Sequence, residues 1–296
     1  MGFRTAFFAL SCLAAAGAQA QEVFSPFVAS QDDSVARMVK LAKLKAGDVV
    51  VDLGSGDGRI VLAAARASPG VTGWGVDLDE KLVARANETA RKEGLAQRVQ
   101  FHQRNVFDAD LSKVDVIFMW LFPELQRLLR PKILAEARPG TRVVTNMFDM
   151  GTWQADDVDD NPGLPLRLWV VPANVAGWWN WTLELKGERL DFAAVLEQQF
   201  QKVEGVVRSA DRRRVLHDFK LEGDRLSFSL LTDVERVGYT RHQFSGRVSG
   251  DTIEGKALVY HPVSHGAEDY QYTEVPWRAV RETRSGYFAP TGLDAR

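Results

Sequence analysis

The chain has 296 residues, of which 45% are hydrophobic and 26% are charged, as in an ordinary soluble globular protein. This length is enough for two modest domains or one large one. The formal net charge is -2 at pH 7, so the chain has no basic excess. That balance argues against a protein that binds nucleic acid through a broad phosphate-contacting surface, and we expect no nucleic-acid partner.

The first twenty residues have the pattern of a secretory signal peptide. Arg4 supplies the positive charge, residues 6–17 are apolar and small, and residues 18–20 match an A-x-A cleavage site. A buried N-terminal helix is the alternative interpretation. The stretch is too short and too poorly flanked for a permanent membrane span. We therefore predict a signal peptide at 1–20, export to the periplasm, and no transmembrane span after its removal.

The only cysteine, Cys12, lies inside this leader, in a poor lipoprotein signal that leaves lipidation a minor alternative. The mature chain would then hold no disulfide and no cysteine-bound metal. None of the five histidines shows metal-ligand spacing such as H-x-x-x-H, so we predict no metal site.

Residues 49–60 predict a ligand-binding turn. Three valines lead to Asp52, glycines follow at every second position from Gly54 to Gly58, and an apolar run comes next. This order predicts a buried strand, a tight turn and the start of a helix, whose first amides face the same cleft. The glycines allow positive φ and a close approach to a ligand. The pattern is neither the Walker motif nor G-x-G-x-x-G.

A second buried strand at 71–79 ends in Asp77, 25 residues after Asp52 and thus one β-α-β unit later. An acid at the tip of the second strand accepts hydrogen bonds from ribose hydroxyls in dinucleotide-binding folds. The alternative is that Asp77 caps the helix that starts near Glu80.

Helices and strands alternate up to residue 148, and Pro123 stands at the first position of one helix, as expected there. Such alternation predicts an α/β Rossmann-like domain with a mostly parallel sheet and helices on both faces. The expected helices are 32–44, 58–67, 80–93 and 123–137, and the expected strands are 49–53, 72–78, 98–103, 114–120 and 142–148.

The pattern changes after Asp149. Residues 154–165 are rich in Asp, Pro and Gly and predict a loop, and a strand resumes at 167–171. From Gly177 onward, short alternating runs separated by turn signals predict an antiparallel β-rich domain, either a small barrel or a sandwich. We place the domains at 21–175 and 176–296. The expected strands lie near 178–185, 191–198 (where helical spacing also occurs), 202–208, 213–221, 225–231, 235–240, 242–248, 252–260 and 272–281.

The form D-x-G-x-G-x-G at 52–58 resembles the first motif of class I S-adenosyl-L-methionine (SAM) methyltransferases, in which the loop cradles the amino-acid part of SAM. Over residues 24 to about 177 the chain is similar to one branch of that class. The branch includes lysine methyltransferases of the membrane-embedded c subunit of ATP synthase and many uncharacterised bacterial enzymes. The segments that carry the resemblance are 26–28, 32–44, 45–61, 75–77, 129–132, 139–144, 148–153 and 168–173.

This resemblance implies a SAM-dependent methyltransferase and, by family analogy, a protein lysine as the methyl acceptor. The chain departs from the family at Ala29-Ser30, where Pro-Thr is usual, and at Asn105, where the third strand usually ends in Asp. Asn105 can still accept a hydrogen bond from the adenine amino group through its side-chain carbonyl. The implied cofactor-binding residues are Asp52, Gly54, Ser55, Gly56, Gly58, Asp77, Leu78, Asn105 and Val106.

Methyl transfer from a sulfonium is an in-line displacement that depends on holding the nucleophile on the methyl–sulfur axis. Ligands of open α/β sheets lie beyond the carboxyl ends of the strands, where Asn105, residues 119–122 and residues 148–149 fall. Asp149 is the first candidate to orient or deprotonate an amine, and a helix or turn cap is the alternative.

Several aromatic residues have two interpretations. Trp120, Phe122 and Trp153 could wall a substrate pocket or fill the core; we favour the core for Phe122 and keep Trp120 as a second catalytic candidate. Trp179 and Trp181 should share one face of a strand, with Trp178 on the other, and ordinary core is favoured over a ligand-binding interior.

A second functional hypothesis is an exported binding protein. It would use the β-rich domain for an apolar ligand or a protein partner, and its methyltransferase half would be inactive or structural. Bound SAM, or a methyl label in an envelope protein, would discriminate between the two hypotheses. The oligomeric state is not predicted.

Overall fold

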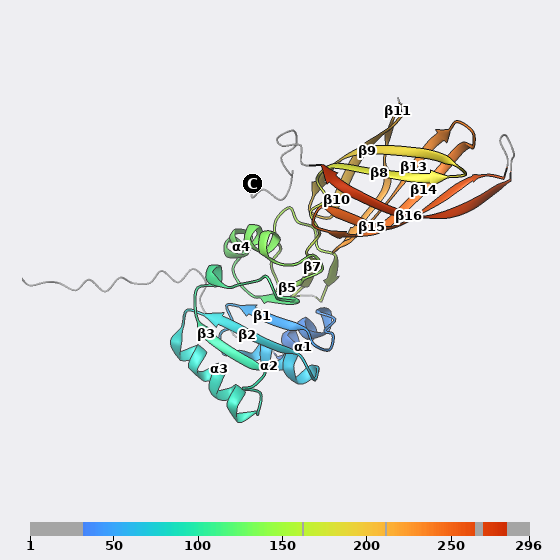
Figure 1. The fold of residues 1–296 in the computed structure, drawn as a ribbon. Coiled ribbons are helices and arrows are strands. Elements are labelled where there is room, and N and C mark those ends of the chain that lie inside the picture. Colours follow the sequence, from blue (N-terminus) through green and yellow to red (C-terminus); the bar gives the residue numbers. More distant parts are fainter. Residues whose placement is uncertain (1–31, 162, 211, 264–268, 283–296) are drawn as a thin grey trace, which may run out of the picture.

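The structure is a computed structural model that describes residues 32–161, 163–210, 212–263 and 269–282. The predicted signal peptide, Cys12 and the N-terminal motif at 26–28 lie outside the described residues. The described chain forms two sheets, one covered by helices and one made of strands alone (Figure 1).

The first sheet has seven strands in the order β3-β2-β1-β4-β5-β7-β6. Its first five strands run parallel, β7 pairs antiparallel with β5, and β6 pairs antiparallel with β7. The predicted Rossmann-like domain with a mostly parallel sheet is therefore confirmed. Its elements are α1 (Asp32–Leu41), β1 (Val49–Leu53), α2 (Arg59–Ala67), β2 (Thr72–Asp77), α3 (Glu80–Lys92), β3 (Val99–Gln103), the 3₁₀ helix η1 (Val106–Asp108), β4 (Val116–Met119), α4 (Pro123–Glu136), β5 (Arg142–Asn146), β6 (Asp157–Asp159) and β7 (Leu166–Val170).

Side chains that alternate along the buried strands enter two separate cores, one on each face of this sheet. Val50 packs with residues of α1, α2 and α3, whereas its neighbour Val51 packs with residues of α4. In the same way, Val144 of β5 joins the first core and Val143 joins the second. This alternation fixes which face each side chain at the strand ends occupies.

The expected loop at 154–165 contains a short strand, β6, and this expectation is wrong in that part. Two of the acids that predicted a loop are bound by cations of α1 and of the turn that follows it. Arg37 donates two hydrogen bonds to Asp159, at 2.9 and 2.8 Å, and Lys43 lies 2.7 Å from Asp157. The composition of 154–165 could not predict these ion pairs, because the basic partners lie more than a hundred residues earlier in the chain.

The second sheet has nine antiparallel strands in the order β11-β10-β9-β8-β16-β15-β14-β13-β12. The amide of Leu216 donates to the carbonyl of Gly205 at 2.9 Å, so the chain between β11 and β12 returns to β10 and the sheet nearly closes. The barrel-like alternative is confirmed over the sandwich. The strands are β8 (Gly177–Leu185), β9 (Glu188–Gln199), β10 (Lys202–Ser209), β11 (Arg212–Val215), β12 (His217–Glu222), β13 (Arg225–Val234), β14 (Gly238–Ser249), β15 (Thr252–Pro262) and β16 (Tyr270–Glu282).

Three expectations for this sheet need correction. The run 213–221 splits at Leu216, where the chain crosses between the two ends of the sheet. Most of the two runs 235–240 and 242–248 form the single strand β14, after a turn at 235–237. The helical spacing in 192–200 carries no helix, because alternate residues of β9 point into the interior and out of it.

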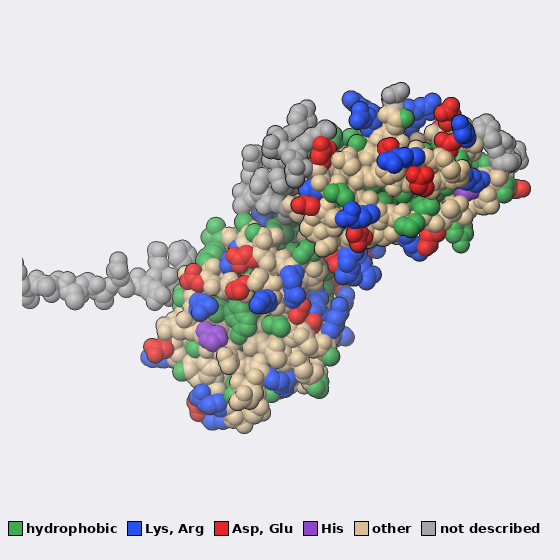
Figure 2. Space-filling model, in the orientation of Figure 1, with side chains coloured by type: hydrophobic (Ala, Val, Ile, Leu, Met, Phe, Trp, Pro, Cys, Tyr) green, Lys and Arg blue, Asp and Glu red, His purple; other side chains and the backbone are tan. Residues whose placement is uncertain are grey.

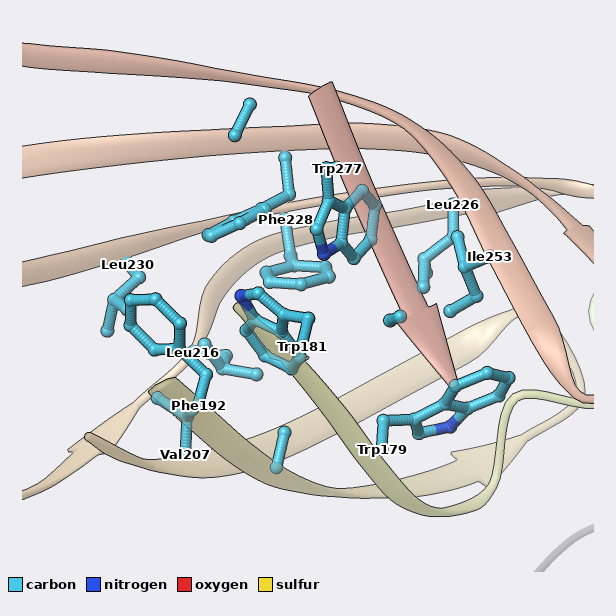
Figure 3. Packing of buried hydrophobic residues seen from close by; sticks show 14 of the residues in the cluster. Trp179, Trp181, Phe192, Val207, Leu216, Leu226, Phe228, Leu230, Ile253 and Trp277 are labelled. Carbon is cyan, nitrogen blue, oxygen red and sulfur yellow. The ribbon is translucent and has the colours of Figure 1, made fainter. Parts of the chain in front are cut away.

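The interior of the nine-stranded sheet is filled by aromatic side chains (Figure 3). The ring of Trp181 lies 5.2 Å from that of Phe192, 5.5 Å from Phe244 and 6.1 Å from Trp277, measured between centroids. Trp179 is also buried, whereas Trp178 is half-buried on the other face. The predicted alternation of the tryptophans and their place in the core are confirmed.

The two sheets touch through the turn between β9 and β10. Phe200 stacks on Trp153 at 5.7 Å, and the guanidinium of Arg130 lies 5.4 Å from the centre of the Phe200 ring. Phe200 thereby joins the core under α4. Trp153 is 1% exposed, so its undecided interpretation resolves to core rather than pocket wall.

Candidate functional site

The glycine loop between β1 and α2 needs glycine both for its backbone and for space. Gly54, Gly56 and Gly58 have φ values of 87°, 52° and 81°, in the left-handed region. A Cβ on Gly54 would lie 2.6 Å from Cδ2 of Leu121, and one on Gly58 would lie 2.5 Å from Cζ of Phe101. Gly58 at the N-cap of α2 has no side chain to cap the helix, and the amide of Arg59, the first of α2, donates to the carboxylate of Asp57.

The acid at the end of β2 holds this loop. The amide of Gly56 donates to Asp77 at 2.8 Å, and the amide of Asp79 donates to its other oxygen at 3.0 Å. Asp79, not Asp77, caps α3, because its side chain accepts from the amides of Lys81 and Leu82. The capping alternative for Asp77 is therefore wrong. A carboxylate has about four lone-pair positions, so Asp77 keeps two for a ligand.

Asp52 and Ser55 present unpaired buried atoms beside the loop. Asp52 is 1% exposed, and its Oδ1 and the Oγ of Ser55 have no hydrogen-bond partner. Burial raises the pKa of Asp52 well above its ordinary value, and the charges of Asp77 and Asp57 add to that rise. An unpaired buried carboxyl is unfavourable unless a cation or a donor completes it. This pair of side chains is therefore suited to a polar, cationic part of a ligand.

Apolar side chains are exposed where four successive strands end. We call this side of the sheet, where β1 to β5 finish, the carboxyl edge. Phe122 is 39% exposed and its ring lies 6.3 Å from that of Phe148, so the expectation that Phe122 fills the core is wrong. It precedes α4, whose inward face is formed by later residues. The exposed set comprises Leu78 after β2, Phe107 after β3, Phe122 after β4 and Met147 after β5.

The other predicted site residues have definite local partners. Asn105 caps η1, because its Oδ1 accepts from the amide of Phe107 at 3.0 Å, and one lone pair of that oxygen remains. Val106 and Trp120 are half-buried at the carboxyl edge. Asp149 has the geometry of a turn cap, which was its alternative interpretation. It is exposed, and its Oδ1 accepts a hydrogen bond from the amide of Gly151 at 2.8 Å.

The predicted site residues lie at or after the ends of β1 to β5, at the carboxyl edge. The ends of β1 to β4 hold the glycine loop and the predicted cofactor residues. Asp149 follows β5 and lies 3.8 Å from Arg127 of α4. Sequence reasoning did not identify Phe107 or Met147, because an exposed apolar residue in a loop has no periodic signal.

A hollow of about 1110 Å³ lies elsewhere, over the nine-stranded sheet. Most of its lining residues point outward from β8, β9, β15 and β16, among them Thr182, Asp191, Glu254 and Arg278. It mixes acidic and basic groups, and Figure 2 shows both kinds interspersed over both parts of the molecule. This hollow contains none of the predicted site residues.

Neither a metal cluster nor a membrane-spanning helix occurs in the part of the chain that the structure describes. No three His, Cys, Asp or Glu side chains in the described ranges are grouped so that they could hold a metal ion. Of the helices that the structure describes, none is both long and apolar enough to cross a bilayer.

Comparisons with known proteins agree with the motifs. The profile of the ANTKMT methyltransferase domain matches residues 52–157. A protein-lysine N-methyltransferase of Saccharolobus islandicus is 33% identical over 150 residues, which are 49% of this chain and 93% of that enzyme. The adenine nucleotide translocase lysine N-methyltransferase of Mus musculus is 34% identical over 44% of this chain, and the match spans 56% of its length.

Among solved structures, an RNA methyltransferase of Salinibacter ruber in complex with S-adenosyl-L-homocysteine is 40% identical. It covers 50% of this chain and 96% of its own, with a TM-score of 0.49. The matched segment of the two enzyme relatives is about half of this chain.

Proposed function

Because the chain belongs to the family of SAM-dependent protein-lysine methyltransferases, we propose that it transfers a methyl group from SAM to the amine of a protein lysine. The observation that carries the proposal is the carboxyl edge of β1 and β2. Three left-handed glycines, an unpaired buried carboxyl at Asp52 and spare lone pairs on Asp77 lie together there. The carboxyl and the lone pairs match the ammonium and the ribose hydroxyls of SAM, and the glycines let the backbone approach the ligand closely.

We assign each group by its chemistry. Asp52 faces the ammonium of the amino-acid part, which would keep its carboxyl ionised. Asp77 accepts hydrogen bonds from the ribose hydroxyls. The adenine lies against Leu78 and Val106, and the remaining lone pair of Asn105 accepts from its amino group. Ser55 remains a further donor to the amino-acid part.

Bound SAM supplies a methyl group on a positively charged sulfur. The residues of the chain then hold the acceptor amine in line with it and exclude water, which is the main requirement of this displacement. Phe122, Phe148 and Met147 offer apolar surface to the stem of a lysine side chain. Trp120 and Asp149 stay candidates for contact with the acceptor.

Two further proposals concern place and partner. The signal peptide at 1–20 would deliver the enzyme to the periplasm, and the acceptor would then be an envelope protein. Aromatic side chains fill the interior of the nine-stranded sheet, so the binding-protein hypothesis would have to place its ligand in the hollow outside that interior. The two lysine N-methyltransferases that match this chain do not favour the binding-protein hypothesis either.

The proposal is tested by incubating the purified protein with methyl-labelled SAM and a cell-envelope fraction. We expect label in methyllysine after acid hydrolysis, lost with Asp77→Ala and retained with Asp79→Ala. The second variant removes the neighbouring helix cap and serves as the matched control. Label found in RNA, or in no macromolecule although SAM binds, would contradict the lysine assignment.

A further inference from the structure

One side chain at the carboxyl edge belongs to no interaction described so far. Asn146, the last residue of β5, is 0% exposed, and neither its Oδ1 nor its Nδ2 has a hydrogen-bond partner. Leaving buried polar groups unpaired costs about 1–3 kcal/mol each. Buried carboxamides are almost always paired in folded proteins, so an exception calls for a partner from outside the chain.

The strand register places Asn146 level with the glycine loop. Leu53 of β1 aligns with Met119 of β4, which aligns with Thr145 of β5. The next positions, Gly54, Trp120 and Asn146, therefore form one row across the carboxyl edge. By alternation along β5, the side chain of Asn146 lies on the face of Val144, which is also the face of Asp52.

The backbone after Asn146 is held in a strained turn. Met147 has φ 68°, which costs a residue with a Cβ about 1–2 kcal/mol. The amide of Phe148 donates to the carbonyl of Asn146 at 2.8 Å, and the hydroxyl of Thr145 donates to the carbonyl of Phe148 at 2.7 Å. These bonds fix the direction of the chain and hold Met147 at the rim. Such strain in a surface turn is typical of a functional site.

The surroundings suit a lysine side chain. Met147, the residue after Asn146, is 37% exposed, and the ring of Phe148, two residues after Asn146, lies 6.3 Å from that of Phe122. An apolar rim that leads to one buried polar group matches an aliphatic stem that ends in an amine. Asp149 is less suited, because it is exposed and already accepts from Gly151.

We propose that Asn146 is the residue that receives and orients the acceptor amine. Its Oδ1 accepts a hydrogen bond from one amine N–H, so that the nitrogen lone pair points along the methyl–sulfur axis. As the new N–C bond forms, the C–S bond breaks, its electron pair stays on sulfur, and the methylated ammonium later releases one proton to water. This inference rests on the proposed amine acceptor.

The test uses two ligands that differ at the reacting position. S-Adenosyl-L-homocysteine has a bare sulfur there, whereas sinefungin carries a primary amine on carbon, close to where the acceptor nitrogen would lie. Calorimetric titration gives both dissociation constants for the wild type, for Asn146→Leu and for Asn146→Asp. The readout is the ratio of the two constants, so it requires neither the natural substrate nor turnover.

We expect the affinity of Asn146→Leu for S-adenosyl-L-homocysteine to stay within about twofold of the wild-type value. Its preference for sinefungin over S-adenosyl-L-homocysteine should fall about tenfold or more. Asn146→Asp should keep or raise that preference, because a carboxylate also accepts from the amine. The free protein should not lose stability in Asn146→Leu, since an apolar residue removes two unpaired groups. Asn146→Ala repeats the titration should the Leu variant not fold.

The matched control is Gln126→Leu, which removes another buried carboxamide with an unpaired oxygen from the α4 side of the sheet. Its ligand preference should equal that of the wild type. An unchanged preference in Asn146→Leu, or an equal loss of both ligands, would overturn the role of Asn146 and leave the proposed function standing. A folded wild type that binds neither ligand would overturn the proposed function itself.

Discussion

The seven-stranded and nine-stranded parts place backbone strain in different positions. In the nine-stranded part the left-handed residues Lys186, Phe200 and Ala210 stand at hairpin turns, and Asp218 stands at a register shift. Tight hairpins require positive φ, so the turn explains that strain. In the seven-stranded part Lys43 follows the end of α1, and Met147 follows β5, which a long connection rather than a hairpin joins to the next strand. The strain at Met147 therefore supports the carboxyl edge as the side where the proposed function takes place.

Unpaired buried groups differ in the same way. In the nine-stranded part they include Nδ1 of the buried His242 and the ring N–H groups of Trp181 and Trp277, and these indoles lie among aromatic faces that can receive a weak N–H···π contact. In the seven-stranded part they include the carboxyl of Asp52 and the carboxamide of Asn146. Aromatic faces cannot provide hydrogen bonds to the oxygens of these two groups, whereas a polar ligand can.

The largest change in stability that tests this comparison is expected at the glycine loop. Gly58→Ala should destabilise the protein by about 2–5 kcal/mol, from left-handed strain of about 1–2 and overlap with Phe101 of about 1–3. Gly47→Ala, at φ 84° with open space, should cost only the strain. Urea midpoints measure both variants. Equal losses would show that space around Gly58 plays no part.

The next effect tests the filled interior of the nine-stranded part through pH. Burial lowers the pKa of His242 from 6.5 to about 4. Between these values the unfolded chain binds a proton that the folded chain does not, so stability held above pH 6.5 is lost as pH falls toward 4. The loss should reach about 3 kcal/mol.

His242→Gln should remove this part of the pH dependence and keep a donor for Thr240, while His217→Gln, at an exposed position, serves as the control. Chemical denaturation at pH 7.5 and pH 4.5 measures the difference. An unchanged pH dependence in His242→Gln would contradict a buried neutral imidazole.

Asp52→Asn should have a smaller effect on stability, and one of opposite sign. The raised pKa of Asp52 means that its contribution is favourable at low pH and is lost as pH rises through the folded value. The variant should therefore stabilise the free protein at pH 8 by about 1–2 kcal/mol and weaken SAM binding. Thermal unfolding with and without SAM measures both. A destabilised free protein would show that Asp52 serves folding rather than the ligand.

The smallest effect is expected on the surface of the nine-stranded part. Lys256→Ala breaks an ion pair of 2.8 Å with Glu274, and both side chains are about half exposed. Exposed pairs contribute little to stability, because water screens the charges and ordering two long side chains costs entropy. We expect a denaturation midpoint close to that of the wild type, and a midpoint as low as that of Gly58→Ala would contradict the distinction between the site and the surface.

Local patterns predicted most of the fold. Alternation along β8 placed Trp179 and Trp181 inside, and the three glycines predicted the left-handed turn that the structure contains. Pairing over long sequence distances was not predictable. β6 depends on Arg37 of α1, and the closure of the second sheet depends on Leu216 reaching Gly205.

The candidate site divides in the same manner. Asp52 and Asp77 were predictable because each ends a strand within one β-α-β unit. Asn146 was not, because its significance lies in having no partner although it is fully buried, and sequence records neither burial nor partners. Phe122 was assigned to the core because hydrophobicity alone does not distinguish a rim from an interior.

The central claim is that SAM binds at the carboxyl edge of β1 and β2. Its most direct test is calorimetric titration of S-adenosyl-L-homocysteine into the folded wild type, Asp77→Ala and Asp79→Ala. We predict micromolar binding by the wild type and by Asp79→Ala, and its loss in Asp77→Ala. Equal binding by all three proteins would contradict the assignment of the ribose site, and no binding by the folded wild type would contradict the central claim.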